Sequence, residues 1–118
     1  MAISVTSPVC GGGSFIVNGV SADASGCEEL KAGAAGKTIL VDRLTINNGA
    51  SALSHTIGEG ETTPGSVDTA LIGPIAMAAN TSLQWNFNPP MQLTTAKSLV
   101  VDSSGAGAVC VFVQGRVV

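Results

Sequence analysis

The stretch Lys37-Thr-Ile-Leu-Val-Asp-Arg-Leu-Thr-Ile-Asn47 decides the fold class. Apolar and polar residues alternate along it with a period of two, which is the period of a β-strand with one buried face. Ile39 and Val41 share one face, but the apolar residues after position 43 fall in the opposite phase. This slip predicts one long strand with a bulge or bend at Asp42-Arg43.

Short alternating segments lie on both sides of this strand. Clusters of Gly, Ser, Thr and Asn separate them at intervals of about eight to twelve residues, as in antiparallel sandwiches and barrels. No segment has a convincing helical period; residues 28–32 are the only candidate for a helical turn, and Gly33 and Gly36 would end it. The sequence predicts an all-β fold, an antiparallel β-sandwich or jelly roll of about eight strands. The expected strands cover residues 3–6, 15–20, 37–47, 53–58, 70–77, 81–87, 97–102 and 107–114.

Turn signals predict how some of these strands connect. Asn47-Asn-Gly-Ala50 predicts a tight turn, because Asn-Gly tolerates positive φ, and a hairpin with 53–58 as its return strand is expected to follow. A second hairpin, made of 97–102 and 107–114, is expected to close the domain. Since proline donates no ladder hydrogen bond, the Gly73-Pro74 step should lie at a sheet edge or a bulge.

The composition indicates an assembly component. The 118 residues make one domain, here residues 1–118. Charged residues are only 11% of the chain, against about 25% in an ordinary soluble domain. The surface therefore carries Ser, Thr, Asn and Gly in place of ions, which is expected when copies of the chain or a partner cover it.

Charge and hydropathy exclude two classes of partner. The net charge is −3, and five scattered basic residues cannot neutralise a run of phosphates, so no nucleic-acid partner is expected. The amino terminus has neither a basic n-region nor a long apolar h-region, and the longest apolar runs are far shorter than the roughly eighteen residues of a membrane helix. We expect a soluble chain, made in a cytoplasm, with no membrane partner.

The spacing of the three cysteines in the sequence matches no known zinc-site pattern. Cys10, Cys27 and Cys110 are an odd number, the sequence has no CxxC, and His55 is the only histidine. No metal and no other cofactor is expected. Cys110 lies in the apolar run 108–113, which predicts a small buried hydrophobe. Cys10 and Cys27 could be bridged or remain two free thiols, and a reducing compartment favours the thiols.

His55 is the only imidazole that a hydrolase could use. Its strand phase aligns it with Leu53 and Ile57, on a face that has to be at least half buried. No nucleophile motif such as GxSxG accompanies it. We expect a hydrogen-bonded core or interface histidine, no catalytic residue, and a chain that is not an enzyme. A hydrolase would instead need His55 paired with a serine or a carboxylate in a pocket.

The acidic residues Glu59, Glu61 and Asp68 lie in the longest polar segment, residues 59–68. The Pro64-Gly65 step fixes a turn there, so solvated side chains on a mobile loop are expected. A cation clip made of these three carboxylates would lack the dense oxygen spacing of an EF-hand loop.

The four aromatic residues, Phe15, Trp85, Phe87 and Phe112, fall at inward phases of the expected strands, and the chain has no tyrosine. This favours a core role over an exposed platform that stacks on sugars or bases. Trp85 is in addition a candidate anchor of a protein interface. The candidate interface residues are Trp85, His55, Arg43, Glu59, Glu61 and Asp68.

Several turns and strands between residues 35 and 90 are similar to those of a known family. They are Ala35-Gly-Lys-Thr-Ile-Leu-Val41, the Leu-Thr-Ile-Asn-Asn run at 44–48, and Leu71-Ile-Gly-Pro-Ile-Ala-Met-Ala-Ala-Asn80 followed by Trp85-Asn-Phe-Asn-Pro-Pro90. The closing segments 97–102 and 109–118 also look similar. In these parts the chain resembles small phage-encoded virion proteins of the jelly-roll head-decoration, or cement, family.

The resemblance implies a structural virion protein on the capsid surface, synthesised in the host cytoplasm. It implies a homotrimer at threefold or quasi-threefold positions of a phage head, bridging neighbouring major capsid proteins against internal DNA pressure. Residues 1–13 could then form an N-terminal arm that docks on the shell. The alternative is a receptor- or glycan-binding β-sandwich module of a tail or fibre, with the 59–68 loop as its contact surface.

Overall fold

The computed structural model describes residues 4–6, 13–21, 27–60, 67, 69–105 and 107–118. Within these ranges the chain forms nine strands and no helix, so the predicted all-β class is confirmed. The strands are β1 (Ser4–Thr6), β2 (Ser14–Ser21), β3 (Cys27–Lys31), β4 (Ile39–Asn48), β5 (Leu53–Gly60), β6 (Thr69–Met77), β7 (Ser82–Gln92), β8 (Ser98–Ser103) and β9 (Val109–Val117).

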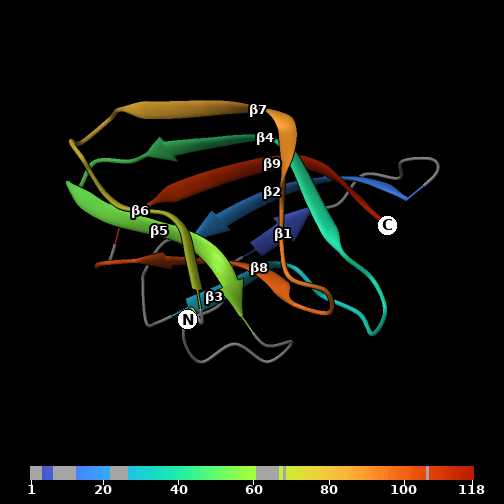
Figure 1. The fold of residues 1–118 in the computed structure, drawn as a ribbon. Helices are drawn as coiled ribbons and strands as arrows, with labels where there is room; N and C mark the ends of the chain where they lie inside the picture. The colour runs from blue at the N-terminus through green and yellow to red at the C-terminus, as the bar shows by residue number, and fades with distance from the viewer. Residues whose placement is uncertain (1–3, 7–12, 22–26, 61–66, 68, 106) are drawn as a thin grey trace.

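The strands are arranged in two antiparallel sheets (Figure 1). The first sheet has five strands in the order β1-β2-β9-β4-β7, and the second has four in the order β3-β8-β5-β6. This two-layer arrangement is consistent with the predicted antiparallel β-sandwich. The strands β7 and β6 are each the outermost strand of their sheet, and they lie at the same side of the molecule (Figure 1).

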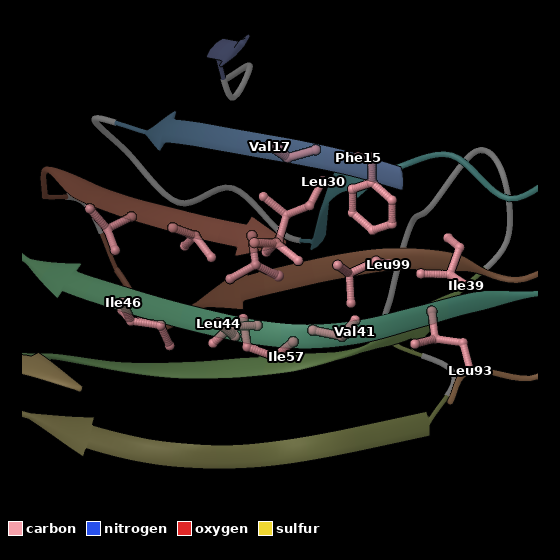
Figure 2. Packing of buried hydrophobic residues seen from close by; sticks show 14 of the residues in the cluster. Phe15, Val17, Leu30, Ile39, Val41, Leu44, Ile46, Ile57, Leu93 and Leu99 are labelled. Atoms are coloured by element: carbon pink, nitrogen blue, oxygen red, sulfur yellow. The ribbon is translucent and has the colours of Figure 1, made fainter. Parts of the chain in front are cut away.

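The core lies between the sheets and takes side chains from both (Figure 2). Val17, Leu44 and Val113 come from the first sheet and Ile57 and Leu99 from the second, and all are 0% exposed. Along β4 and β9 the buried positions alternate with more exposed ones. The period of two in the sequence is therefore the burial pattern of the fold.

The bulge predicted in the long strand is present in β4. The register of β4 shifts between Val41 and Arg43 against both of its neighbours, β7 and β9. Val41 and Leu44 are both fully buried although they are an odd number of residues apart. The extra residue thus turns the second half of the strand back toward the core.

Neither of the two expected hairpins is formed. β4 and β5 belong to different sheets, and so do β8 and β9, so both connections carry the chain from one sheet to the other. The physical reason is that β4 is already paired on both sides, with β7 and β9, and β9 is paired with β2 and β4. The Asn-Gly signal at 48–49 predicts a change of direction, but it does not determine the pairing partner.

Two elements differ in extent from the sequence prediction. Residues 27–31, which overlap the candidate helical turn, form the strand β3; it pairs with β8 and buries Leu30. This strand raises the number from about eight to nine. β7 continues beyond residue 87, because Met91 pairs with Val41. In both cases a neighbouring strand overrides a weak local preference.

The Gly73-Pro74 step lies in β6, the edge strand of the second sheet. The register between β5 and β6 shifts close to it, between His55 and Ile57. The predicted edge or bulge position of this proline is therefore confirmed, and no ladder hydrogen bond is lost in the sheet interior.

The core predicts the effect of truncating Leu44. Leu44→Ala removes a side chain that is 0% exposed, and we expect it to lower the free energy of unfolding by about 2–5 kcal/mol. The measurement is urea unfolding followed by circular dichroism. Val118→Ala, at a position that is 60% exposed, serves as the control and should change stability by less than about 0.5 kcal/mol. Equal effects of the two substitutions would contradict the placement of the core.

Candidate assembly surface

The candidate residues do not converge on one site. Arg43 and Trp85 lie on the neighbouring strands β4 and β7 of the first sheet. His55 and Glu59 lie on β5 of the second sheet, and both are buried. Glu61 and Asp68 lie outside the described residues, as does most of the 59–68 loop. The structure therefore separates the predicted set. Arg43 is exposed on the outer face of the first sheet, and Trp85 is half-buried on its inner face opposite Leu44. His55 and Glu59 are two separate buried polar groups.

His55 belongs to a buried hydrogen-bond network. Its Nε2 lies 3.0 Å from Asn48 Oδ1 and its Nδ1 lies 2.7 Å from Ser103 Oγ. The amide of Asn48 is oriented by its Nδ2, which donates to backbone carbonyls, so its Oδ1 faces His55 as an acceptor. His55 Nε2–H therefore donates to Asn48 Oδ1, and His55 Nδ1 accepts a hydrogen bond from the Ser103 hydroxyl. Asn48 Nδ2 donates to the carbonyl oxygens of Ser51, Met77 and Ala78, at 2.9, 3.3 and 3.0 Å.

Of the two predicted alternatives, a hydrogen-bonded core histidine or an interface histidine, this network agrees with the core one. His55 does have a serine partner, as a hydrolase would require, but its side chain is only 1% exposed. A shallow hollow of the surface is lined by Leu53, Ser54 and Ser104 among others, and neither His55 nor Ser103 lines it. The imidazole joins β5 to the end of β4, across the two sheets.

Glu59 differs from the sequence prediction. The sequence predicts a solvated loop at this position, but Glu59 is part of β5 and only 6% exposed. Its Oε2 accepts a hydrogen bond from Thr94 N and its Oε1 from Thr94 Oγ1, both at 2.7 Å. A buried carboxylate needs such donors. No local pattern indicates that Thr94, far away in the chain, supplies them. Glu59 thus links the end of β5 to the segment after β7.

The strands β6 and β7 carry no charge. Residues 69–96, which contain both strands, include no Asp, Glu, Lys, Arg or His. Several apolar side chains of these strands pack against the core and remain partly exposed. We call this side of the molecule the β6–β7 edge, and its apolar residues are Leu71, Ile72 and Ile75 of β6 and Leu83, Trp85, Phe87 and Met91 of β7.

The aromatic residues only partly follow the expected inward phases. Phe15 is buried at 5% exposure, whereas Trp85 and Phe87 are half-buried at the β6–β7 edge, where Leu83 is 38% exposed. No further strand of the described chain lies beyond β7, so the inward face of this edge strand is incompletely covered. Phe112 is wrongly predicted: its neighbours in β9 are buried, so its half-buried ring lies on the outer face of the first sheet.

The outer face of the first sheet is polar with few charges. Arg43 Nε donates to Asn86 Oδ1 at 2.9 Å, and Ser82 Oγ donates to Asn47 Oδ1 at 2.7 Å. Cys110, expected as a buried hydrophobe, is half-buried on this face, and its Sγ lies 2.9 Å from its acceptor, an Asn side chain of β2. Alternation explains the error, because Cys110 lies between two inward-facing valines. Arg43 is exposed on this outer face, as is expected of a candidate interface residue.

Comparison of the chain with protein-family models, curated proteins and solved structures finds no match. Among the described side chains, no group of three or more His, Cys, Asp and Glu could hold a metal ion. The described ranges likewise contain no helix that is long and apolar enough to cross a membrane. The observations that bear on function are therefore the fold, the two buried polar links of β5 and the β6–β7 edge.

His55 predicts a pH dependence of stability. Burial lowers the pKa of His55 below its ordinary value of 6.5. The unfolded chain then binds a proton at a higher pH than the folded chain does, so this contribution is complete above pH 6.5 and is lost as the pH falls below it. We expect urea unfolding to show lower stability at about pH 5.5 than at about pH 7.5. His55→Gln should be less stable at both pH values and should lack this component; an unchanged pH dependence in the variant would contradict the assignment.

Glu59 and Thr94 predict an energetic coupling. Glu59→Gln and Thr94→Ala should each lower the free energy of unfolding by about 1–3 kcal/mol, because each leaves a buried polar group with a poorer partner. The double variant should lose less than the sum, by at least about 0.5 kcal/mol. A double-mutant cycle by chemical unfolding measures this, and strictly additive losses would show that the carboxylate does not hold residue 94.

Proposed function

We propose that the chain is a structural virion protein, a capsid decoration or cement protein. In this proposal it binds the surface of a phage head as a homotrimer and stabilises the shell by bridging neighbouring major capsid proteins. It acts by binding alone, with no catalytic residue and no cofactor. The proposal draws on the family resemblance of residues 35–90 and on the sparsely charged surface.

The strand order supports a jelly roll as the finer description of the fold. If β1 is set aside, the two sheets have the orders β2-β9-β4-β7 and β3-β8-β5-β6. Two four-stranded antiparallel sheets whose successive strands alternate between layers are what the double Greek key of a jelly roll requires. Only β5 and β6 are both consecutive and paired among these eight strands. The short β1 then extends the first sheet at its edge, next to β2.

The observation that carries the functional proposal is the absence of charge from residues 69–96. Long edge strands that face water are ordinarily protected by charged side chains, Lys above all. Apolar side chains that are half-buried at an uncharged edge are suited to coverage by protein. A virion component is covered permanently, by its copies and by the shell. An uncharged edge is then not exposed to water and does not promote aggregation.

Bridging also explains why no chemistry is needed. A rigid trimer that makes three modest contacts with a shell binds tightly, because after the first contact the other two form at high effective concentration. The polar outer face of the first sheet is one surface for such contacts. Of the arm expected over residues 1–13, Ser4–Thr6 is instead the strand β1, which pairs with β2 of the same chain. The partner is then the major capsid protein, and no nucleic acid or membrane is involved.

The proposal predicts binding to heads that lack the protein. The chain should cosediment with decoration-free heads of the virus that encodes it, saturate at a fixed number of trimers per head, and raise the temperature at which the heads release DNA. Heads that already carry the protein are the control and should take up none. A folded, trimeric chain that does not bind empty positions at saturating concentration would rule out the cement function and leave the tail or fibre module as the better explanation.

A further inference from the structure

We infer that the outer face of the first sheet is the surface that docks on the shell, and that Arg43 on this face binds a carboxylate of the partner. This inference rests on the proposed cement function, and it names the docking face of the chain and the chemistry that the face recognises. The occupant is an acidic patch on the surface of the major capsid protein.

The bulge in β4 is what brings Arg43 to this face. In a regular strand, residues 41 and 43 would point to the same side of the sheet, and Val41 points into the core at 0% exposure. Because the register of β4 shifts between Val41 and Arg43, Leu44 returns to the core and Arg43 is exposed on the outer face. β4 lies between β7 and β9 (Figure 1), so Arg43 does not protect a sheet edge from pairing, which is a common reason for a charge in a strand.

The guanidinium of Arg43 is oriented by the fold, but it pairs with no carboxylate of the described residues. Its Nε donates to Asn86 Oδ1 at 2.9 Å, from β4 to β7. Asp42 is the one carboxylate in the strands of the first sheet, and its Oδ1 lies 3.5 Å from Nη2 of Arg116. The two Nη groups of Arg43 therefore remain for a ligand. Such planar donors match the two oxygens of a carboxylate in direction as well as in charge.

The charges of the chain are divided unevenly between the two sheets. The strands of the second sheet carry more carboxylates than cations, namely Glu28, Glu29, Glu59 and Asp102 against Lys31. In the strands of the first sheet the balance is reversed, because Asp42 is outnumbered by Arg43 and Arg116. A chain of net charge −3 repels an acidic partner in general. Charge complementarity therefore directs an acidic partner to the outer face of the first sheet.

The neighbours of Arg43 are typical of a protein interface. Asn86 of β7 and Gln114 of β9 are its register partners, and both are exposed on the same face. In the next row, Thr45 pairs with Phe112, whose ring is half-buried on this face. Arg and aromatic residues are enriched at protein interfaces, whereas Lys and Glu are depleted, and the strands of the first sheet contain neither Lys nor Glu. The amides can pair with the polar groups that flank a carboxylate on a protein surface.

Phe112 also indicates a protein in preference to a glycan. A sugar ring stacks on the exposed flat side of an aromatic ring. Phe112 is half-buried between Asn18 of β2 and Thr45 of β4, its register partners, and does not present such a platform. A partly covered ring beside an arginine is suited to packing against the side chains of a folded surface.

The test compares three variants that each lower the net charge of the chain by one, in cosedimentation with decoration-free heads over a range of chain concentrations. Arg43→Gln removes the guanidinium, and Gln114→Glu places a carboxylate of the chain itself beside it. Lys37→Gln, at an exposed lysine between β3 and β4, is the matched control. We expect each of the first two to weaken binding at least about tenfold. Lys37→Gln should bind within about twofold of the wild type.

The salt dependence of binding is a second readout, which a purely structural role of Arg43 would not change. Salt screens the attraction between exposed charges. Binding of the wild-type chain should therefore weaken as sodium chloride is added, and binding of Arg43→Gln should depend less on salt. Equal salt dependence of the two proteins would contradict a charge pair at Arg43.

The outcomes separate this inference from the proposed function. If Arg43→Gln and Gln114→Glu bind heads as the wild type does, or if Lys37→Gln binds as weakly as they do, the inference is overturned and the cement function stands. If the wild-type chain does not bind heads, the cement function and the inference fail together. Binding to an array of acidic oligosaccharides, lost in Arg43→Gln, would then assign the face to a glycan.

The fold and the mass of each variant complete the test. Circular dichroism shows whether the variants fold, and light scattering shows whether they form the same oligomer as the wild type. A folded Arg43→Gln that no longer forms this oligomer would assign the face to a second copy of the chain and overturn the inference. If Arg43→Gln does not fold, Gln114→Glu decides alone, since Gln114 is exposed.

Discussion

The strand β4 is held between β7 and β9, and the bulge between Val41 and Arg43 allows both halves of it to face the core. The other features of the structure depend on this arrangement. Because both sides of β4 are paired, the turn after Asn48 must lead to the other sheet, and this places β5 across the core from β4. β7, paired with β4 alone, becomes an edge strand whose inward face is incompletely covered.

Side chains of β5 form buried hydrogen bonds with residues outside its own sheet at two places. His55 contacts Asn48 near one end of β5, and Glu59 contacts Thr94 near the other. Apolar packing is not directional, whereas hydrogen bonds to buried polar groups have a defined geometry and are costly to break. The core therefore supplies most of the cohesion, and these links set how one sheet lies over the other. A rigid sandwich of this kind suits a protein that acts as a spacer or a bridge.

The sequence predicts this fold well where alternation is strong and poorly where partners are distant in the chain. The strand from 37 to 47, its bulge and the edge position of Pro74 follow from local patterns. β3 does not, because Cys-Glu-Glu-Leu-Lys gains its strand conformation only beside β8. The local sequence predicts a solvated Glu59, because no neighbouring residue indicates Thr94 as its partner. The absence of charge from residues 69–96 suggests no structure by itself. Only the sheet order and the packing of the two sheets show that these residues form two edges at one side of the molecule (Figure 1).

In the proposed function, the low charge of this chain reflects a surface that its own copies and a shell cover. Light scattering after size-exclusion chromatography measures the absolute mass of the particle in solution independently of its shape. A homotrimer should give the mass of three chains, unchanged over a wide dilution series. The mass of a single chain at every concentration would show that no copies of the chain cover this surface.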